Sequence, residues 1–171
     1  MDLRAYIRDI PDFPKPGILF YDITPLLGHP AAFKHSIDLM AERFQDSGAT
    51  KVACAEARGF IFGAALAYKM DIGFVPVRKP GKLPWKTTTV TYDLEYGTDT
   101  LCMHEDAFLR DEKILLIDDV LATGGTLQGM LKLMAACNVD IVGIGVLAEL
   151  EFLQGREKLG NIPLESLVKL G

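Results

Sequence analysis

The chain has 171 residues and a net charge of −5, and we expect it to form a single domain over residues 1–171. Hydrophobic residues make up 49% and charged residues 24%, so an ordinary globular core is possible, and the acidic balance argues against non-specific binding to nucleic acid. No apolar run approaches the roughly 18 residues of a membrane span. The three cysteines lack metal-ligand spacing and the N-terminus lacks a signal-peptide pattern, which predicts a cytoplasmic protein with free thiols.

The first predicted feature is an extended arm over residues 11–27. Three prolines in its first six positions, followed by Gly17, exclude a helix there. The arm ends in a short apolar segment at residues 18–20, and these residues alone favour a packed N-terminal strap. Pro30 then opens a helix that runs to about Asp46, which we interpret as purely structural.

A strand predicted over residues 51–57 leads into the polar turn Glu56-Ala57-Arg58-Gly59-Phe60, and a helix is predicted over residues 61–70. Ligands bind at the carboxyl ends of strands in an α/β sheet. Arg58 could hold two phosphate oxygens from such a turn. A surface arginine in an ordinary connecting loop is the alternative.

A long excursion, residues 78–113, follows a short strand predicted at residues 72–77. No acidic residue lies between Asp71 and Asp93, whereas four cations do: Arg78, Lys79, Lys82 and Lys86. The pattern is typical either of a mobile cationic lid over a diphosphate or of a solvated basic loop.

The rest of this excursion predicts a two-stranded flap. Residues 87–92 and 100–104 are prone to form strands, and Gly97 lies in the turn between them. Glu95 precedes the turn, and on its own it would be interpreted as a surface carboxylate.

The most informative stretch is residues 114–126, Ile-Leu-Leu-Ile-Asp-Asp-Val-Leu-Ala-Thr-Gly-Gly-Thr. Its four aliphatic residues predict a buried strand, and an amphipathic helix is predicted over residues 127–138. The first N–H groups of a helix have no intrahelical partner and carry the positive end of the dipole, and glycine lets an anion approach closely. Thr123 and Thr126 add hydroxyl donors, and either can cap the helix. The loop therefore predicts a phosphate site formed by Ala122, Thr123, Gly124, Gly125 and Thr126.

The acidic pair Asp118 and Asp119 cannot bind the same phosphate. Carboxylates suit sugar hydroxyls, from which they accept hydrogen bonds, or a hydrated Mg²⁺. A phosphate beside a diol and a metal describes a ribose phosphate. The spacing is neither a Walker loop nor a Rossmann fingerprint, and an ordinary strand crossover with a Gly-Gly turn is the remaining alternative.

Another strand is predicted over residues 140–147, at the right distance for a βαβ unit. Leu150 beyond it and Val120 are candidate apolar walls for a planar base, with simple core packing as the alternative. A short helix over residues 155–159 and an edge strand over residues 167–170 complete the prediction.

On these residues the chain resembles the type I phosphoribosyltransferases. Residues 114–126 are similar to their signature for phosphoribosyl pyrophosphate (PRPP), and the chain from about Phe13 to Leu170 most resembles the members that act on adenine. The resemblance implies an α/β fold with a mostly parallel sheet flanked by helices. It also implies an N-terminal hood within residues 1–30, and a flexible loop and flap within residues 78–113.

The resemblance implies a reaction in purine salvage, in which adenine and PRPP give AMP and diphosphate. It implies a homodimer and a Mg²⁺ ion held mainly by the substrate, with Asp118 and Asp119 reaching the metal through water. The carbon–oxygen bond of the sugar should break ahead of attack, leaving a cationic sugar that the same carboxylates orient and stabilise.

The resemblance also assigns roles to single residues. The arm resembles the family's hood, which implies recognition of adenine by the backbone of Leu19, Phe20 and Tyr21. The turn at Arg58 looks like the family's diphosphate loop, which extends diphosphate binding to the lid cations Arg78, Lys79 and Lys82, within one chain or across a dimer. Glu95, in a Leu-Glu-Tyr-Gly motif, corresponds to the proposed proton-handling residue.

Three alternatives stay open at this point. Many family members carry arginine at the position of Tyr21, so hypoxanthine, guanine or xanthine could replace adenine. Regulators of the same fold bind PRPP without catalysis, but they carry a DNA-binding domain or a basic face, for which this acidic chain has neither the length nor the charge. A synthase that makes PRPP would need an ATP site and a much longer chain.

Overall fold

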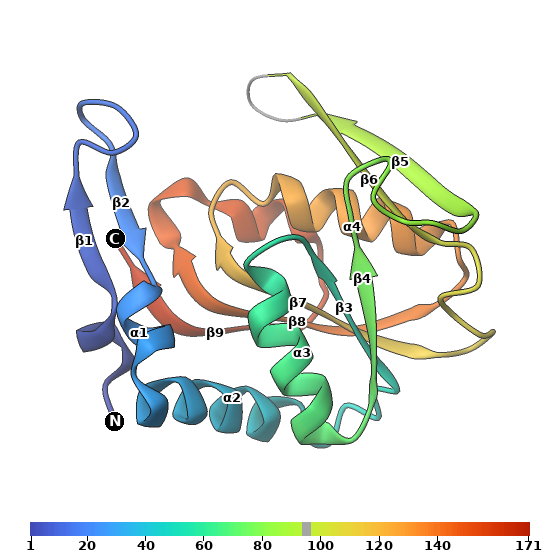
Figure 1. Cartoon of the computed structure of the whole chain (residues 1–171), viewed down its shortest axis with the longest axis horizontal. Coiled ribbons are helices and arrows are strands. Elements are labelled where there is room, and N and C mark those ends of the chain that lie inside the picture. Colours follow the sequence, from blue (N-terminus) through green and yellow to red (C-terminus); the bar gives the residue numbers. More distant parts are fainter. Residues whose placement is uncertain (94–96) are drawn as a thin grey trace.

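The structure, a computed structural model, describes residues 1–93 and 97–171. Its centre is a five-stranded sheet in the order β4-β3-β7-β8-β9, and every neighbouring pair is parallel (Figure 1). The strands are β3 (Lys51–Ala55), β4 (Gly73–Val77), β7 (Lys113–Leu121), β8 (Asp140–Leu150) and β9 (Leu164–Leu170). The predicted α/β class with a parallel sheet is confirmed.

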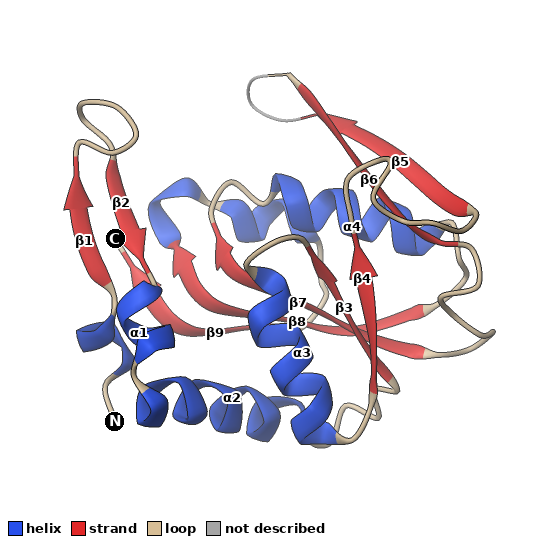
Figure 2. Ribbon diagram, in the orientation of Figure 1, coloured by secondary structure: helices blue, strands red, loops and turns tan. Residues whose placement is uncertain are grey.

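Both faces of the sheet are buried, which explains the continuous apolar runs of its strands. In β3, Val52 and Cys54 join the core on one face, whereas Ala53 and Ala55 join the core on the other. Figure 2 shows the helices divided between the two sides. The helices α2 (Pro30–Phe44) and α3 (Gly59–Met70) contribute to the first core, and α4 (Gly125–Ala135) contributes to the second.

Two antiparallel hairpins form separate two-stranded sheets, on opposite sides of the molecule (Figure 1). The first pairs β1 (Arg8–Pro11) with β2 (Leu19–Asp22), so the predicted arm folds back on itself. The second pairs β5 (Thr87–Asp93) with β6 (Thr98–His104), which confirms the predicted flap. The predicted turn of this flap includes residues 94–96, which lie outside the described residues.

The strand order reverses between β3 and β7. From β3 the chain passes through α3 to β4 on one side, and from β7 it passes through α4 to β8 on the other. A reversal of this kind leaves a crevice at the carboxyl ends of the two strands, where α/β proteins bind ligands. The turn containing Arg58 and the acidic pair both lie at this crevice.

Several predicted boundaries were wrong. The acidic pair lies within β7 and not after it, because pairing with β8 continues as far as Leu121. The helix α4 begins at Gly125 and ends at Ala135, earlier at both ends than predicted. The last strand begins at Leu164, because β9 pairs along the carboxyl-terminal half of β8.

Short helical elements complete the described part of the chain. They are η1 (Leu3–Tyr6), α1 (Thr24–Gly28), η2 (Glu151–Leu153) and η3 (Gly155–Leu159). The predicted short helix over residues 155–159 is therefore present as η3. Within residues 1–93 and 97–171, every helix is too short or too polar to cross a membrane.

Candidate active site

A cavity of about 610 Å³ lies between the first hairpin and the carboxyl ends of the sheet strands. Its walls come from β2, the turn after β3, the end of β7, the start of α4 and the last residue of β8. All five residues predicted to contact a base line it: Leu19, Phe20, Tyr21, Val120 and Leu150. Arg58, Asp118 and Asp119 line the same space, so the fold brings distant predicted residues to one place.

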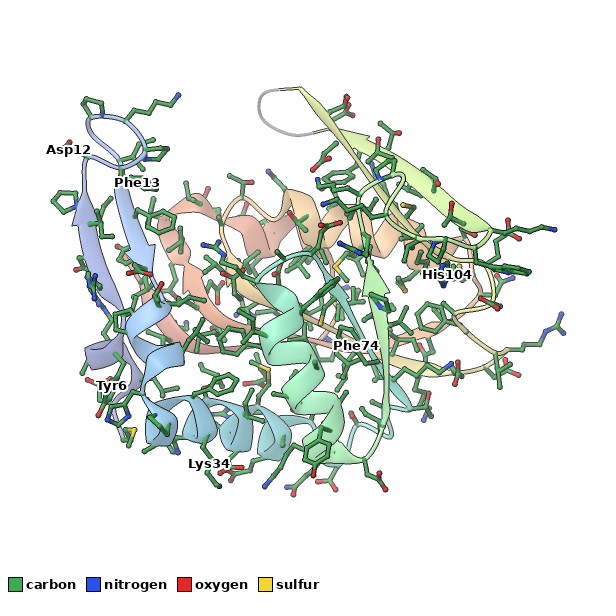
Figure 3. The ribbon with its side chains drawn as sticks, viewed as in Figure 1. Tyr6, Asp12, Phe13, Lys34, Phe74 and His104 are labelled. Atoms are coloured by element: carbon green, nitrogen blue, oxygen red, sulfur yellow. The ribbon has the colours of Figure 1, made fainter. Side chains whose placement is uncertain are left out.

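The first hairpin forms one wall of the cavity through apolar contacts. Phe13 lies at the tip of the hairpin, as Figure 3 shows, and its ring packs edge-on against Phe20 with centroids 5.1 Å apart. The guanidinium carbon of Arg58 lies 5.9 Å from the centroid of the Phe20 ring, and that of Arg4 lies 5.7 Å from the centroid of Tyr21. These contacts fix the aromatic side chains of β2 beside the polar part of the site.

The acidic pair is buried: Asp118 is 9% exposed and Asp119 is 5% exposed. Oδ1 of Asp118 accepts a hydrogen bond of 2.9 Å from the backbone N–H of Asp119. Burial, and then the charge of Asp119, raise the pKa of Asp118 well above its usual value. Gly59 makes this packing possible, because a Cβ there would lie 2.9 Å from Asp118 Oδ1.

Arg58 connects the turn after β3 to the acidic pair. Its Nε lies 2.7 Å from Oδ2 of Asp119, while 49% of the arginine side chain is exposed. The approach lacks hydrogen-bond alignment, and Asp119 Oδ2 is a buried acceptor without a hydrogen-bond partner in the described part of the chain. The site therefore holds a buried carboxylate whose Oδ2 forms an ion pair with an accessible cation.

The phosphate loop, residues 122–126, encloses a second small cavity of about 90 Å³. The first intrahelical bond of α4 runs from the N–H of Gln128 to the carbonyl of Gly124, at 2.9 Å. The N–H groups of residues 125–127 are therefore not used inside the helix and can bind an anion. The small cavity shares Asp118, Val120, Ala122 and Thr126 with the large one.

The helix cap differs from the prediction. Neither Thr123 nor Thr126 caps α4; Gly124 is the N-cap, without a side-chain hydrogen bond. Its φ of +81° is a conformation that side chains with a Cβ rarely adopt. A Cβ at Gly124 would also lie 2.6 Å from the carbonyl oxygen of Gly155. The hydroxyl groups of the threonines are consequently not used as caps.

The predicted lid cations gather around Glu56. Its Oε1 accepts a hydrogen bond of 2.6 Å from the backbone N–H of Lys79, and its Oε2 lies 2.8 Å from Nζ of Lys82. Nε of Arg78 lies 3.4 Å from Oε1, and the ammonium group of Lys79 pairs with Asp99. Among the residues that line the large cavity, Glu56 is present but Arg78, Lys79 and Lys82 are not. The cations therefore reach the cavity through their contacts with Glu56, which lines it.

This cation cluster strongly favours the charged form of Glu56. Burial opposes ionisation, but the Lys82 side chain, the Lys79 backbone N–H and the charge of Arg78 together lower the pKa of Glu56 to about 2. The sequence does not predict that Glu56 binds these cations, although it does place Glu56 in the same turn as Arg58.

The predicted proton-handling residue Glu95 lies outside the described residues. The strands of the same flap are described, and β5 packs on α4. Tyr92 is buried, its hydroxyl lies 3.2 Å from Oδ2 of Asp99, and burial followed by the charge of Asp99 raises the pKa of Tyr92 to about 12. A Cβ at Gly129 would lie 2.6 Å from the Tyr92 ring, so glycine at this position lets the flap pack closely on α4.

The acidic pair by itself does not form a complete metal site. Within residues 1–93 and 97–171, no three His, Cys, Asp or Glu side chains gather as metal ligands. Asp118 and Asp119 offer carboxylate oxygens on one side, including Oδ2 of Asp119, which has no hydrogen bond in the described part of the chain. This donor set fits Mg²⁺ that keeps most of its ligands from a phosphate substrate and water.

Comparison with known proteins agrees with this geometry. A model of the phosphoribosyl transferase domain matches residues 22–160. The adenine phosphoribosyltransferase of Solidesulfovibrio magneticus is 70% identical over 99% of this chain and 99% of its own length. That of Maridesulfovibrio salexigens is 62% identical over 99% of this chain and 100% of its own length.

Solved structures give the same result. The crystal structure of adenine phosphoribosyltransferase from Thermoanaerobacter pseudethanolicus matches with a TM-score of 0.94 and 48% identity, over 98% of each chain. The Saccharomyces cerevisiae enzyme, complexed with an imino-altritol bisphosphate and adenine, matches with a TM-score of 0.90 and 36% identity, over 96% of each chain.

Proposed function

The chain belongs to the phosphoribosyl transferase family, among its adenine phosphoribosyltransferases, and from this premise we propose how its cavity carries out the reaction. The reaction is that of purine salvage: adenine and PRPP give AMP and diphosphate. One observation carries the assignment of residues. The large cavity is lined by β2, the turn at Arg58 and the acidic pair, which suit a base, a diphosphate and a ribose, and it shares Asp118, Ala122 and Thr126 with the small cavity of the phosphate loop, which suits a phosphate.

Adenine binds between β2 and the apolar side chains of Val120 and Leu150. The strand β2 pairs only with β1 in the described residues, so one edge of its backbone keeps unpaired donors and acceptors. Adenine presents both donors and acceptors at its edge, and such an edge can pair with the backbone of Leu19, Phe20 and Tyr21. Recognition by backbone makes the identity of the Tyr21 side chain less important for base choice.

The ribose phosphate binds across the phosphate loop and the acidic pair. The free N–H groups of the phosphate loop receive the 5′-phosphate. Asp118 and Asp119 accept hydrogen bonds from the 2′ and 3′ hydroxyls. As the bond to the diphosphate breaks, positive charge on the sugar is stabilised by these two buried carboxylates.

The diphosphate binds on the side of Arg58, whose exposed guanidinium can turn toward phosphate oxygens. Arg78, Lys79 and Lys82, which contact Glu56, add positive charge on the same side as Arg58. Asp118 and Asp119 would hold Mg²⁺ through water, and the ion would supply positive charge that neutralises the diphosphate. Closure of the loop and flap over the sugar keeps water from the cationic centre.

The remaining assignments rest on the family resemblance. Glu95 handles the proton of the base, and the chain works as a cytoplasmic homodimer. Residues 1–30 form the hood and residues 78–113 form the loop and flap of a single domain over residues 1–171. Light scattering coupled to size exclusion tests the homodimer directly, because a mass near one chain of 18.8 kDa contradicts it.

The decisive experiment measures product formation from PRPP, Mg²⁺ and each purine base in turn, read by chromatography. We expect AMP from adenine and little product from hypoxanthine, guanine or xanthine. A different preferred nucleotide would overturn the assignment of β2 and keep the transfer reaction. Binding of PRPP without any product would favour a regulatory protein.

A further inference from the structure

We infer that Gly155 and Arg156 are positioning residues, which hold the phosphate loop in the shape that binds the 5′-phosphate. The inference rests on the proposed function of that loop, and it adds residues from a part of the chain for which the sequence predicts no role beyond a short helix. The support segment, residues 154–159, follows β8 and contains η3. In Figure 1 the chain after β8 returns toward the end of α4 that follows the phosphate loop.

Gly155 lies directly against the phosphate loop, backbone to backbone. A Cβ at Gly155 would lie 2.2 Å from the carbonyl oxygen of Ala122 and 2.9 Å from the backbone nitrogen of Gly124. In the opposite direction, a Cβ at Gly124 would lie 2.6 Å from the carbonyl oxygen of Gly155. Real Cβ atoms essentially never approach other atoms so closely, so both positions require glycine for this contact. The phosphate loop thus rests on Gly155 at Ala122 and at Gly124, the residue with positive φ.

Arg156 fixes the support segment to the sheet. Its Nε and Nη2 donate hydrogen bonds of 2.9 and 2.6 Å to the two oxygens of Glu149, a bidentate pair, and its Nη1 donates to the carbonyl of Leu164 at 3.1 Å. Glu149 is only 5% exposed, and its Oε2 also accepts a hydrogen bond of 2.8 Å from Ser166. One arginine therefore connects the support segment to both β8 and β9.

A second anchor holds the far end of the same segment. Leu159 is buried and belongs to the core cluster that contains Leu127 and Met130 of α4. The support segment is consequently held at Arg156 and at Leu159. A movement of Gly155 away from the loop would disturb the Arg156 hydrogen bonds or the packing of Leu159. This arrangement gives the loop a rigid backing at Ala122 and Gly124.

The charge of the network also favours rigidity. The Arg156 hydrogen bonds lower the pKa of the Glu149 carboxyl, so the pair remains ionised under ordinary conditions. Removing the guanidinium would leave a buried carboxylate with Ser166 as its remaining side-chain donor. The support segment would then be free to shift, and the N–H groups of residues 125–127 would lose their alignment.

The test compares two pairs of variants. Gly155→Ala pushes on the phosphate loop directly, and Gly28→Ala is its control, because nothing lies within 4 Å of a Cβ at Gly28. Arg156→Ala should release the support segment fully, and Arg156→Lys should release it partly. Lys158→Ala is their control, since Lys158 is an exposed cation in η3 of the same support segment.

Binding of ribose 5-phosphate is measured by calorimetry, and the KM values for PRPP and adenine are measured separately. We expect Gly155→Ala and Arg156→Ala to raise the Kd for ribose 5-phosphate and the KM for PRPP by about tenfold or more. The KM for adenine should stay within about twofold, with Arg156→Lys intermediate and both controls like the parent chain. Melting temperatures verify that each variant is folded.

Two outcomes would overturn the inference. Unchanged binding of ribose 5-phosphate in folded Gly155→Ala would show that the contact does not shape the loop. Equal losses for adenine and PRPP, in parallel with a lower melting temperature, would assign Gly155 and Arg156 a structural role only. Because the calorimetry needs no turnover, the inference can fail while AMP formation stands, and the proposed function can fail while ribose 5-phosphate still binds.

Discussion

Nε of Arg58 lies 2.7 Å from Oδ2 of Asp119, although the two residues come from different strand ends of the sheet and are far apart in the chain. The pair places a cation that can bind diphosphate next to a carboxylate that can bind ribose. Because the Arg58 side chain is half exposed and Asp119 is buried, the arginine can move toward a ligand while the carboxylate stays in place.

Asp119→Asn should lower kcat by about 100- to 1000-fold, because the site loses a charge that stabilises the cationic sugar. Folding should persist, since the amide keeps the shape of the carboxylate. Steady-state kinetics and a thermal melt check both statements. Asp140→Asn, an exposed change at the start of β8, is the matched control. Unchanged kinetics in Asp119→Asn would remove the acidic pair from the mechanism.

Arg58→Ala should raise the KM for diphosphate in the reverse reaction from AMP by about 10- to 100-fold, the loss expected for hydrogen bonds to a charged group. The KM for AMP should change less, because its phosphate binds at the other end of the cavity. Arg43→Ala serves as the control, since Arg43 is exposed on α2 and pairs with Glu165. If diphosphate binds equally well to both variants, Arg58 has been assigned to the wrong ligand.

Asp118→Asn should make the protein more stable and less active at neutral pH. The pKa of Asp118 is raised in the folded state, so the folded protein keeps this proton to higher pH than the unfolded chain does. The stability contributed by the carboxyl is therefore present below its usual pKa of 3.8 and is lost as the pH rises through the raised value. Thermal melts from pH 4 to pH 8 should show an advantage of Asp118→Asn that grows with pH. A constant difference across this range would contradict the raised pKa.

Glu56→Gln should be less sensitive to acid than the parent chain. The pKa of Glu56 is lowered from 4.5 to about 2, so its contribution to stability is present above pH 4.5 and is lost as the pH falls toward 2. At neutral pH the variant should lose about 1 to 2 kcal/mol, a figure reduced for the exposed Lys82 partner. Urea unfolding at several pH values measures this, with Glu42→Gln on α2 as the control. If Glu56→Gln and the parent chain lost the same stability in acid, the pairing of Glu56 with these cations would not be a cause of that loss.

Removal of Mg²⁺ with a chelator should abolish AMP formation, and added Mg²⁺ should restore it. The melting temperature of the protein without substrate should not change, because no cluster of three potential metal ligands exists in the described residues. A lower melting temperature on chelation would indicate a metal held by the protein itself. Activity that survives chelation would exclude the proposed role of Mg²⁺.

Local features of the site were predictable because they depend on residues close together in the chain. The order of strand, acidic pair, glycine loop and helix in residues 114–126 predicted an α/β unit, and the structure has a strand, a glycine loop and a helix in that order, with the acidic pair inside the strand. The antiparallel flap was predictable for the same reason. Boundaries were less accurate: the length of β7 depends on pairing with β8, which sequence periodicity does not contain.

Contacts between distant segments were decided only by the tertiary structure. The sequence alone does not indicate that Glu56 binds the cations of residues 78–82, or that Gly155 lies against Gly124. The amino-acid sequence by itself determined the kinds of chemistry that the chain carries, because glycine, carboxylate and arginine have these properties in any fold. The tertiary structure decided which of them meet, because parallel strands bring their carboxyl ends to one edge regardless of their separation along the chain.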